Sequence, residues 1–275
     1  RPRRWLEVGL LLAAPLLVAL ALRPALMSPA PMIDPHFYTA FLEQGRGLVE
    51  RYGTGNYFWV RVGFLLPARA SYELFGAVPG FVALRYVLAL VAAVPGYLLL
   101  RRLHGPAAGA LAVVGLLGSP VLLYAWGSDY PDAAAVSYLA AGWALLGLAA
   151  TAPEARPRAR RGWLTAAAVA FTLAVHSQLV ALAVVAAAVA AYLWVSHGRS
   201  WRPAAGDAAL LLAVGIWGTV LLAGLALAVL GSADILTPTL RAVAMLQAGP
   251  DAGRWHSATW RWVQDEPYLL VPPLL

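Results

Sequence analysis

The sequence AALLLAVGIWGTVLLAGLALAVL, residues 208–230, contains no charged side chain. A bilayer core is about 30 Å thick, so a helix needs about 20 consecutive apolar residues to cross it. Hydrocarbon offers no partner to an exposed backbone N–H or C=O group, which favours a helix in such a segment. This stretch therefore predicts a membrane-spanning helix.

Six further stretches have the same apolar character, at residues 5–27, 77–100, 106–125, 132–151, 163–177 and 178–195. Hydrophobic residues make up 61% of the 275 residues and charged residues 12%, whereas soluble domains contain roughly 25% charged residues. We therefore expect an all-α, polytopic transmembrane helix bundle of about seven spans. A cleaved signal peptide is the alternative interpretation of the first stretch.

The chain as a whole, residues 1–275, is interpreted as one transmembrane domain. Another apolar run begins near Tyr268, close to the last residue of the sequence. We therefore expect this chain to be the N-terminal part of a longer protein.

The arginines indicate the orientation of the bundle. The sequence has no Lys, and its formal net charge is +7. Arginines cluster at 1–4, 101–102, 156–161 and 199–202, in connections that fall on one side of the predicted bundle. By the positive-inside rule this side is cytoplasmic, and so is the N-terminus. Because the positive charge follows the topology, we do not expect a nucleic-acid partner.

Two long segments then face outward, at residues 28–76 and 231–267. In the first, apolar and polar residues recur with helical period over residues 37–52, which predicts an amphipathic helix at the membrane surface. Its apolar or small face comprises Tyr38, Phe41, Leu42, Gly45, Leu48, Val49 and Tyr52, and its polar face Thr39, Glu43, Arg46 and Glu50. A second helical piece, residues 58–75, leads back to the bilayer.

Asp34 follows the first span and precedes Pro35. One interpretation is a helix N-cap with proline in the first turn. Another is a general base, held at the membrane boundary, that takes a proton from an acceptor hydroxyl. The two roles are compatible.

A second acidic group lies in the outer turn between the third and fourth spans, in the sequence WGSDYPD at residues 126–132. Asp129 and Asp132 are suited to hydrogen-bond sugar hydroxyls or to hold a divalent cation. The alternative is a turn followed by an N-cap for the fourth span. We expect no other cofactor.

Three basic residues complete the candidate substrate-binding set. His176, at the outer turn after the fifth predicted span, is either a hydrogen-bonded turn residue or a functional one. Arg85 lies inside the second span, where a charge either faces a cavity, a carboxylate or a lipid phosphate, or extends to the interface. Arg61, on the returning helical piece, is a candidate for an anionic ligand.

The arrangement resembles the GT-C superfamily of membrane glycosyltransferases, in particular its bacterial protein-O-mannosyltransferase-like and aminoarabinose-transferase-like branch. The resemblance covers residues 1 to about 195. It rests on DPHFY at 34–38, RVGFLLP at 61–67 leading to LFG at 74–76, residues 97–102, and SDYPD at 128–132. Relatives in this branch often have a second acid directly after the first-loop Asp, where this chain has Pro35.

The resemblance implies transfer of a sugar from a polyprenyl-phosphate donor to a hydroxyl of a glycan, lipid or protein acceptor, on the outer face of a bacterial plasma membrane. Asp34 would be the catalytic base, and Asp129 and Asp132 secondary acids of the cavity. Two other functions stay open: a transporter or flippase for a lipid-linked substrate, and a non-catalytic membrane scaffold. A transporter would be expected to carry ionisable residues through its spans.

Overall fold

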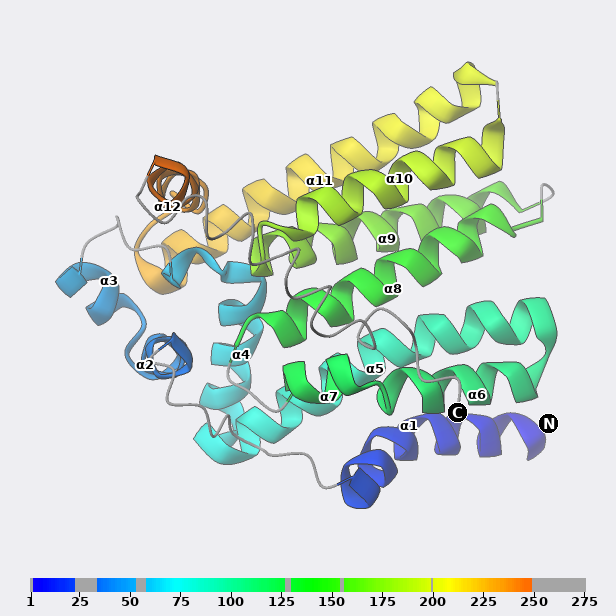
Figure 1. Cartoon of the computed structure of the whole chain (residues 1–275), viewed down its shortest axis with the longest axis horizontal. Coiled ribbons are helices and arrows are strands. Elements are labelled where there is room, and N and C mark those ends of the chain that lie inside the picture. The colour runs from blue at the N-terminus through cyan, green and yellow to red at the C-terminus, as the bar shows by residue number, and fades with distance from the viewer. Residues whose placement is uncertain are drawn as a thin grey trace.

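A computed structural model of the chain describes residues 2–22, 34–52, 58–126, 130–153, 156–198 and 200–248 (Figure 1). Every regular element in these residues is a helix, which confirms the all-α class. The elements are α1 (Pro2–Leu22), α2 (Asp34–Gln44), α3 (Arg46–Tyr52), the 3-10 helix η1 (Phe58–Val60), α4 (Val62–Phe75), α5 (Ala77–His104), α6 (Pro106–Leu117), α7 (Pro120–Trp126), α8 (Asp132–Ala150), α9 (Pro157–Ser177), α10 (Ala181–His197), α11 (Trp201–Leu230) and α12 (Thr237–Ala248).

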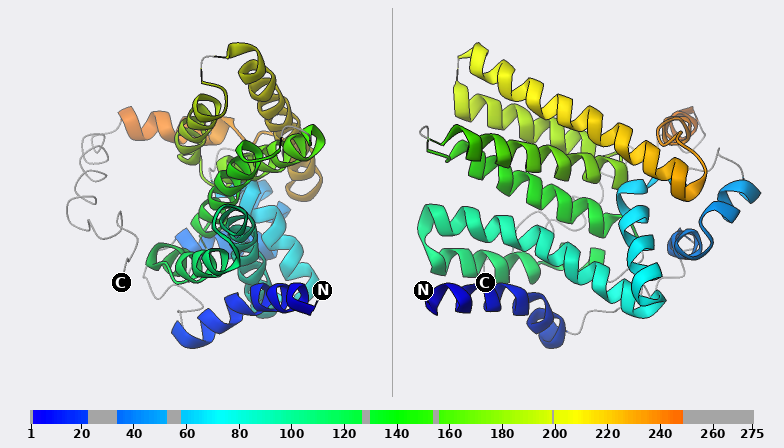
Figure 2. Two further views of the ribbon diagram at one scale, coloured as in Figure 1. Left: turned by 90° about the vertical axis from the view of Figure 1, so that its right-hand side faces the viewer. Right: turned by 180° about the vertical axis from the view of Figure 1, so that it is seen from behind.

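The long helices lie side by side, and short connections join them at two ends (Figures 1 and 2). α8 packs against α5 and α9, α11 packs against α9, and α1 packs against α5 and α6. The N-terminal end of α1, the α5–α6 connection, the end of α8, the start of α9, the end of α10 and the start of α11 lie at one end, on the right in Figure 1. We call this the arginine-rich end, because α5 ends in Arg101 and Arg102 and α9 begins beside Arg156. The opposite end, with α2, α3, α4 and α12, we call the loop end.

Three helices in the described residues are long and apolar enough to span a membrane: α5, α8 and α11. Shorter apolar helices occupy residues 7–21, 106–117 and 181–197. These helices indicate a membrane protein. Seven spans with a cytoplasmic N-terminus stay a prediction.

The third predicted span is wrong as a single helix. The chain forms α6 and α7 instead, with a break at Gly118 and Ser119. Pro120 explains the break, because proline disfavours helical geometry in the residue before it and has no N–H to continue the hydrogen-bond ladder.

The predicted surface helix at residues 37–52 is also divided, into α2 and α3. Gly45 lies between them with φ +46°, a left-handed geometry that suits glycine. The guanidinium of Arg69 packs against Gly45 where a side chain would otherwise project. The predicted apolar face is confirmed where side chains are described, since Tyr38, Phe41 and Leu42 are buried while Glu43 is exposed.

The partner of this apolar face differs from the expectation. α2 packs against α4 and η1, so its apolar side chains enter the protein core rather than the membrane surface. η1 contributes Trp59 to the same core cluster as these side chains, and Trp59 is fully buried. The second helical piece divides in turn at Arg61, and α4 then runs across the ends of the long helices (Figure 1). The largest buried side chains therefore gather at the loop end, with Tyr38, Phe41 and Phe64 beside Trp59.

Candidate functional site

Arg61, Asp132 and His176 come together at the loop end, from the starts of α4 and α8 and the end of α9. Arg61 precedes α4, Asp132 is the first residue of α8, and His176 lies in the last turn of α9. Arg61 and His176 line the same small cavity of about 20 Å³, together with Thr239 of α12. This volume is room for about one water molecule. The positive charge of Arg61 also acts on the carboxylate of Asp132.

Close contact between α4 and α9 produces this approach. A Cβ added at Gly63 would meet the backbone carbonyl oxygen of Leu173 and would lie 2.7 Å from Ser177 Oγ. A glycine at this position therefore lets the start of α4 reach the end of α9. Gln178, the next residue after α9, donates a hydrogen bond from Nε2 to Asp132 Oδ1 at 2.6 Å. The half-buried acid thus joins the start of α8 to the end of α9.

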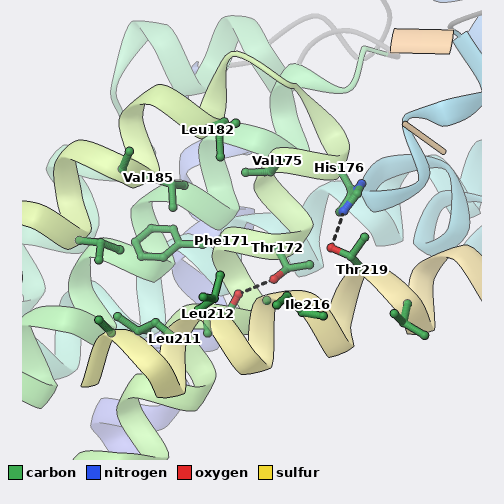
Figure 3. A pocket seen from close by; sticks show the side chains of 16 residues that line it. Phe171, Thr172, Val175, His176, Leu182, Val185, Leu211, Leu212, Ile216 and Thr219 are labelled. Atoms are coloured by element: carbon green, nitrogen blue, oxygen red, sulfur yellow. Dashed lines mark hydrogen bonds between the residues drawn. The ribbon is translucent and has the colours of Figure 1, made fainter. Parts of the chain in front are cut away.

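His176 is 6% exposed, and its Nε2 is 3.0 Å from Oγ1 of Thr219 on α11 (Figure 3). It is thus a buried, hydrogen-bonded residue in the last turn of α9, as one of its two interpretations expected. The same side chain lines a second, much larger cavity between α9, α10 and α11. His176 and its neighbour Val175 therefore lie between the small cavity and this larger one.

The larger cavity is an apolar groove of about 520 Å³. Leu182, Val185 and Phe171 form part of its walls, and the polar atoms of Thr172 and Thr219 lie along one side (Figure 3). Its size is typical of small-molecule sites, which measure about 300–1,000 Å³. In a membrane such a groove suits a hydrocarbon chain, and His176 is at its loop end.

Arg85 is 8% exposed and has well-defined neighbours. Its Nε donates a hydrogen bond to the carbonyl oxygen of Trp126 at 3.0 Å, and its guanidinium carbon lies 4.0 Å from the centre of the Phe81 ring. The indole N–H of Trp126 donates in turn to Ser137 Oγ at 3.2 Å. Arg85 thus faces the protein interior and holds Trp126, the first residue of the acidic turn, instead of extending to the interface.

The first outer segment and the acidic turn lie next to each other. Tyr38 of α2 packs edge-on against Tyr130 with 5.3 Å between ring centres, and against Phe58 at the same distance. Asp34 begins α2, one turn before Tyr38. The side chain of Asp34 and the whole of Asp129 lie outside the described residues.

No group of three or more His, Asp or Glu side chains suited to a metal occurs within the described residues. Because Asp129 lies outside these residues, its pairing with Asp132 around a cation stays a prediction. Asp234, in the loop before α12, accepts a hydrogen bond from the backbone N–H of Thr237 at 3.0 Å. Hydrogen bonds from Thr237 lower the pKa of Asp234, consistent with a carboxylate that caps α12.

Sequence reasoning missed a buried polar cluster at the arginine-rich end. Asp207 Oδ2 accepts hydrogen bonds from Arg160 and, at 2.7 Å, from Tyr192, and lies 3.0 Å from His197 Nε2. The cluster joins α9, α10 and α11. The available signal was Asp207 itself, an acid directly before the uncharged stretch 208–230.

Comparison with protein-family models, with curated proteins and with solved structures finds no match to this chain.

Proposed function

We propose that this protein is an inverting glycosyltransferase that moves a sugar from a polyprenyl-phosphate donor to an acceptor hydroxyl on the extracytoplasmic face of the membrane. The observation that carries the proposal is the contact between Tyr38 and Tyr130. Tyr38 is one helical turn from Asp34, and Tyr130 directly follows Asp129. This contact supports a shared site for the first-loop carboxylate and the acidic turn.

The groove between α9, α10 and α11 supports a lipid-linked donor. A polyprenyl chain stays in the bilayer, so its phosphate and sugar lie at headgroup depth. The apolar groove ends at His176, which also borders the cavity that Arg61 lines. A donor whose chain enters this groove would bring its phosphate toward Arg61, a half-buried cation of the loop end.

In the proposed reaction, Asp34 accepts the proton of the acceptor hydroxyl while that oxygen attacks the anomeric carbon of the donor sugar. The bond from the anomeric carbon to the phosphate oxygen breaks, and polyprenyl phosphate leaves with the bonding electrons. Arg61 stabilises the negative charge that grows on this leaving group, an interaction that strengthens in the transition state. One displacement with one base gives inversion at the anomeric carbon.

The test is transfer by the full-length protein in proteoliposomes supplied with envelope acceptors and radiolabelled undecaprenyl-phosphate mannose, arabinose or aminoarabinose. We expect Asp34→Asn to lower transfer at least about 100-fold, the usual scale for loss of a general base. Glu43→Gln is the matched control, because Glu43 is an exposed carboxylate on the same helix, and it should keep full activity.

Three results would count against the assignment. Full transfer by Asp34→Asn would show that Asp34 is not the catalytic base. Label that crosses the membrane while still attached to its lipid, with no acceptor modified, would indicate a flippase. Neither transfer nor movement of any of the three donors would favour a scaffold.

A further inference from the structure

A second groove lies between α1, α5 and α6, on the opposite side of α5 from α8. Its volume is about 440 Å³. Leu11, Ala14 and Val18 of α1 face Ala110 and Val113 of α6 across it. Leu10 and Val114 at its border are 64% and 61% exposed, so the groove opens sideways toward the surface that lipid covers in a membrane.

The groove has one polar end. Of the described residues that line it, Glu7 and Tyr97 carry polar side chains. Tyr97 donates its hydroxyl hydrogen to Glu7 Oε2 at 3.0 Å, and Nη1 of Arg101 contacts the same oxygen at 2.8 Å. These residues lie at the arginine-rich end, where α5 terminates (Figure 1).

Arg101 is positioned to bind a further anion. Its side chain is 38% exposed although Glu7 occupies one side of the guanidinium. A guanidinium has five N–H donors, so one carboxylate oxygen leaves others for a phosphate. The adjacent Arg102 has a different role, because it donates to the carbonyl oxygens of Leu148 and Thr151 at the end of α8.

We propose that this groove binds one acyl chain of an anionic phospholipid from the leaflet at the arginine-rich end, with the headgroup phosphate at Arg101. The apolar walls require a chain, which excludes free phosphate as the ligand. The headgroup is anionic rather than zwitterionic because α5 ends with Arg101, Arg102 and His104. Each arginine near an anionic membrane surface strengthens the attraction about fivefold. Glu7, which lines the groove, positions the Arg101 side chain beside its polar end.

The test is native mass spectrometry of the detergent-purified full-length protein, titrated with dioleoyl phosphatidylglycerol and with dioleoyl phosphatidylcholine. We expect phosphatidylglycerol to bind about tenfold more tightly. Arg101→Gln should abolish that preference while keeping weak binding of both lipids. Ala110→Phe or Ala14→Phe, which fill the groove from its two walls, should each weaken binding of both lipids about tenfold or more.

Two controls make the result specific. Arg202→Gln removes an exposed arginine at the same end, on α11, and should not change the preference. Ala187→Phe adds a ring at an exposed position on α10 and should leave both affinities unchanged. Equal affinities for the two lipids in the unaltered protein would overturn the headgroup assignment. Unchanged binding in folded Ala110→Phe and Ala14→Phe, as judged by circular dichroism, or displacement of phosphatidylglycerol by millimolar inorganic phosphate, would overturn the groove.

Discussion

Asp207 is the acid on which three polar side chains of the arginine-rich end converge. Arg160 comes from α9, and Tyr192 and His197 come from α10, so one carboxylate of α11 fixes three helices. Asp207 is 7% exposed. A buried acid of this kind is stable only when cations and hydrogen-bond donors surround it, and here all of its partners come from other elements.

We predict that Asp207→Asn destabilises the protein by about 3 kcal/mol, because it leaves the positive charge of the half-buried Arg160 without its buried counterion. For a chain of this size, that loss lowers the melting temperature by roughly 6–12 °C. The measurement is thermal unfolding of the purified protein in detergent. Arg161→Gln, which changes the exposed neighbour of Arg160, serves as the control and should have the same melting temperature as the unaltered protein. An unchanged melting temperature for Asp207→Asn would show that the cluster does not hold the helices together.

At the scale of the elements, the apolar stretches predicted the long helices well. α5 begins at Ala77 and α8 at Asp132, the same residues at which the predicted second and fourth spans begin. Hydropathy predicts these helices reliably because each is long and has few charged residues. It could not place the breaks at Gly45 and Arg61, where local backbone geometry decides the structure.

The contacts of the candidate site were less accessible to sequence reasoning. His176 and Asp132 were named as candidates, but Thr219 and Gln178, which bind them, were not. Both partners are ordinary polar residues in apolar surroundings, and only tertiary packing brings them within hydrogen-bond distance. Tertiary packing likewise brings the carbonyl oxygen of Trp126 to Arg85, from which it accepts a hydrogen bond.

Helix packing at the site gives a second prediction, on Gly63. An added Cβ there would meet the Leu173 carbonyl oxygen and the Ser177 side chain, both on α9. Gly63→Ala should therefore destabilise the protein by about 1–3 kcal/mol, the usual cost of overpacking. Gly96→Ala is the matched control, because Gly96 lies inside helix α5 and an added Cβ meets no atom within 4 Å. It should be neutral or slightly stabilising, since alanine favours helix over glycine. Equal melting temperatures for the two variants would show that α4 and α9 are not in close contact.

Across the whole molecule, the two ends of the long helices differ in charge and in the short helices that lie there. Arg101 and Arg102 in the last turn of α5 and the 156–161 cluster at the start of α9 lie at one end, and α2, α3, α4 and α12 lie at the other (Figures 1 and 2). The apolar groove with His176 and the groove with Glu7 open between different helices. The proposed donor chain and the proposed phospholipid therefore occupy separate sites and need not compete.

This separation predicts the orientation in the membrane, which can be measured directly because the chain contains no cysteine. Glu43→Cys places a thiol on an exposed position of α2, and His104→Cys places one at the exposed end of α5. The positive-inside rule predicts that the arginine-rich end is cytoplasmic. A membrane-impermeant maleimide should therefore label Glu43→Cys in intact cells, and label His104→Cys only after the membrane is permeabilised. Labelling of both thiols in intact cells would contradict the proposed bundle. The reverse pattern would place α2 in the cytoplasm, where Asp34 would have no access to an extracytoplasmic acceptor, and the glycosyltransferase proposal would fail with it.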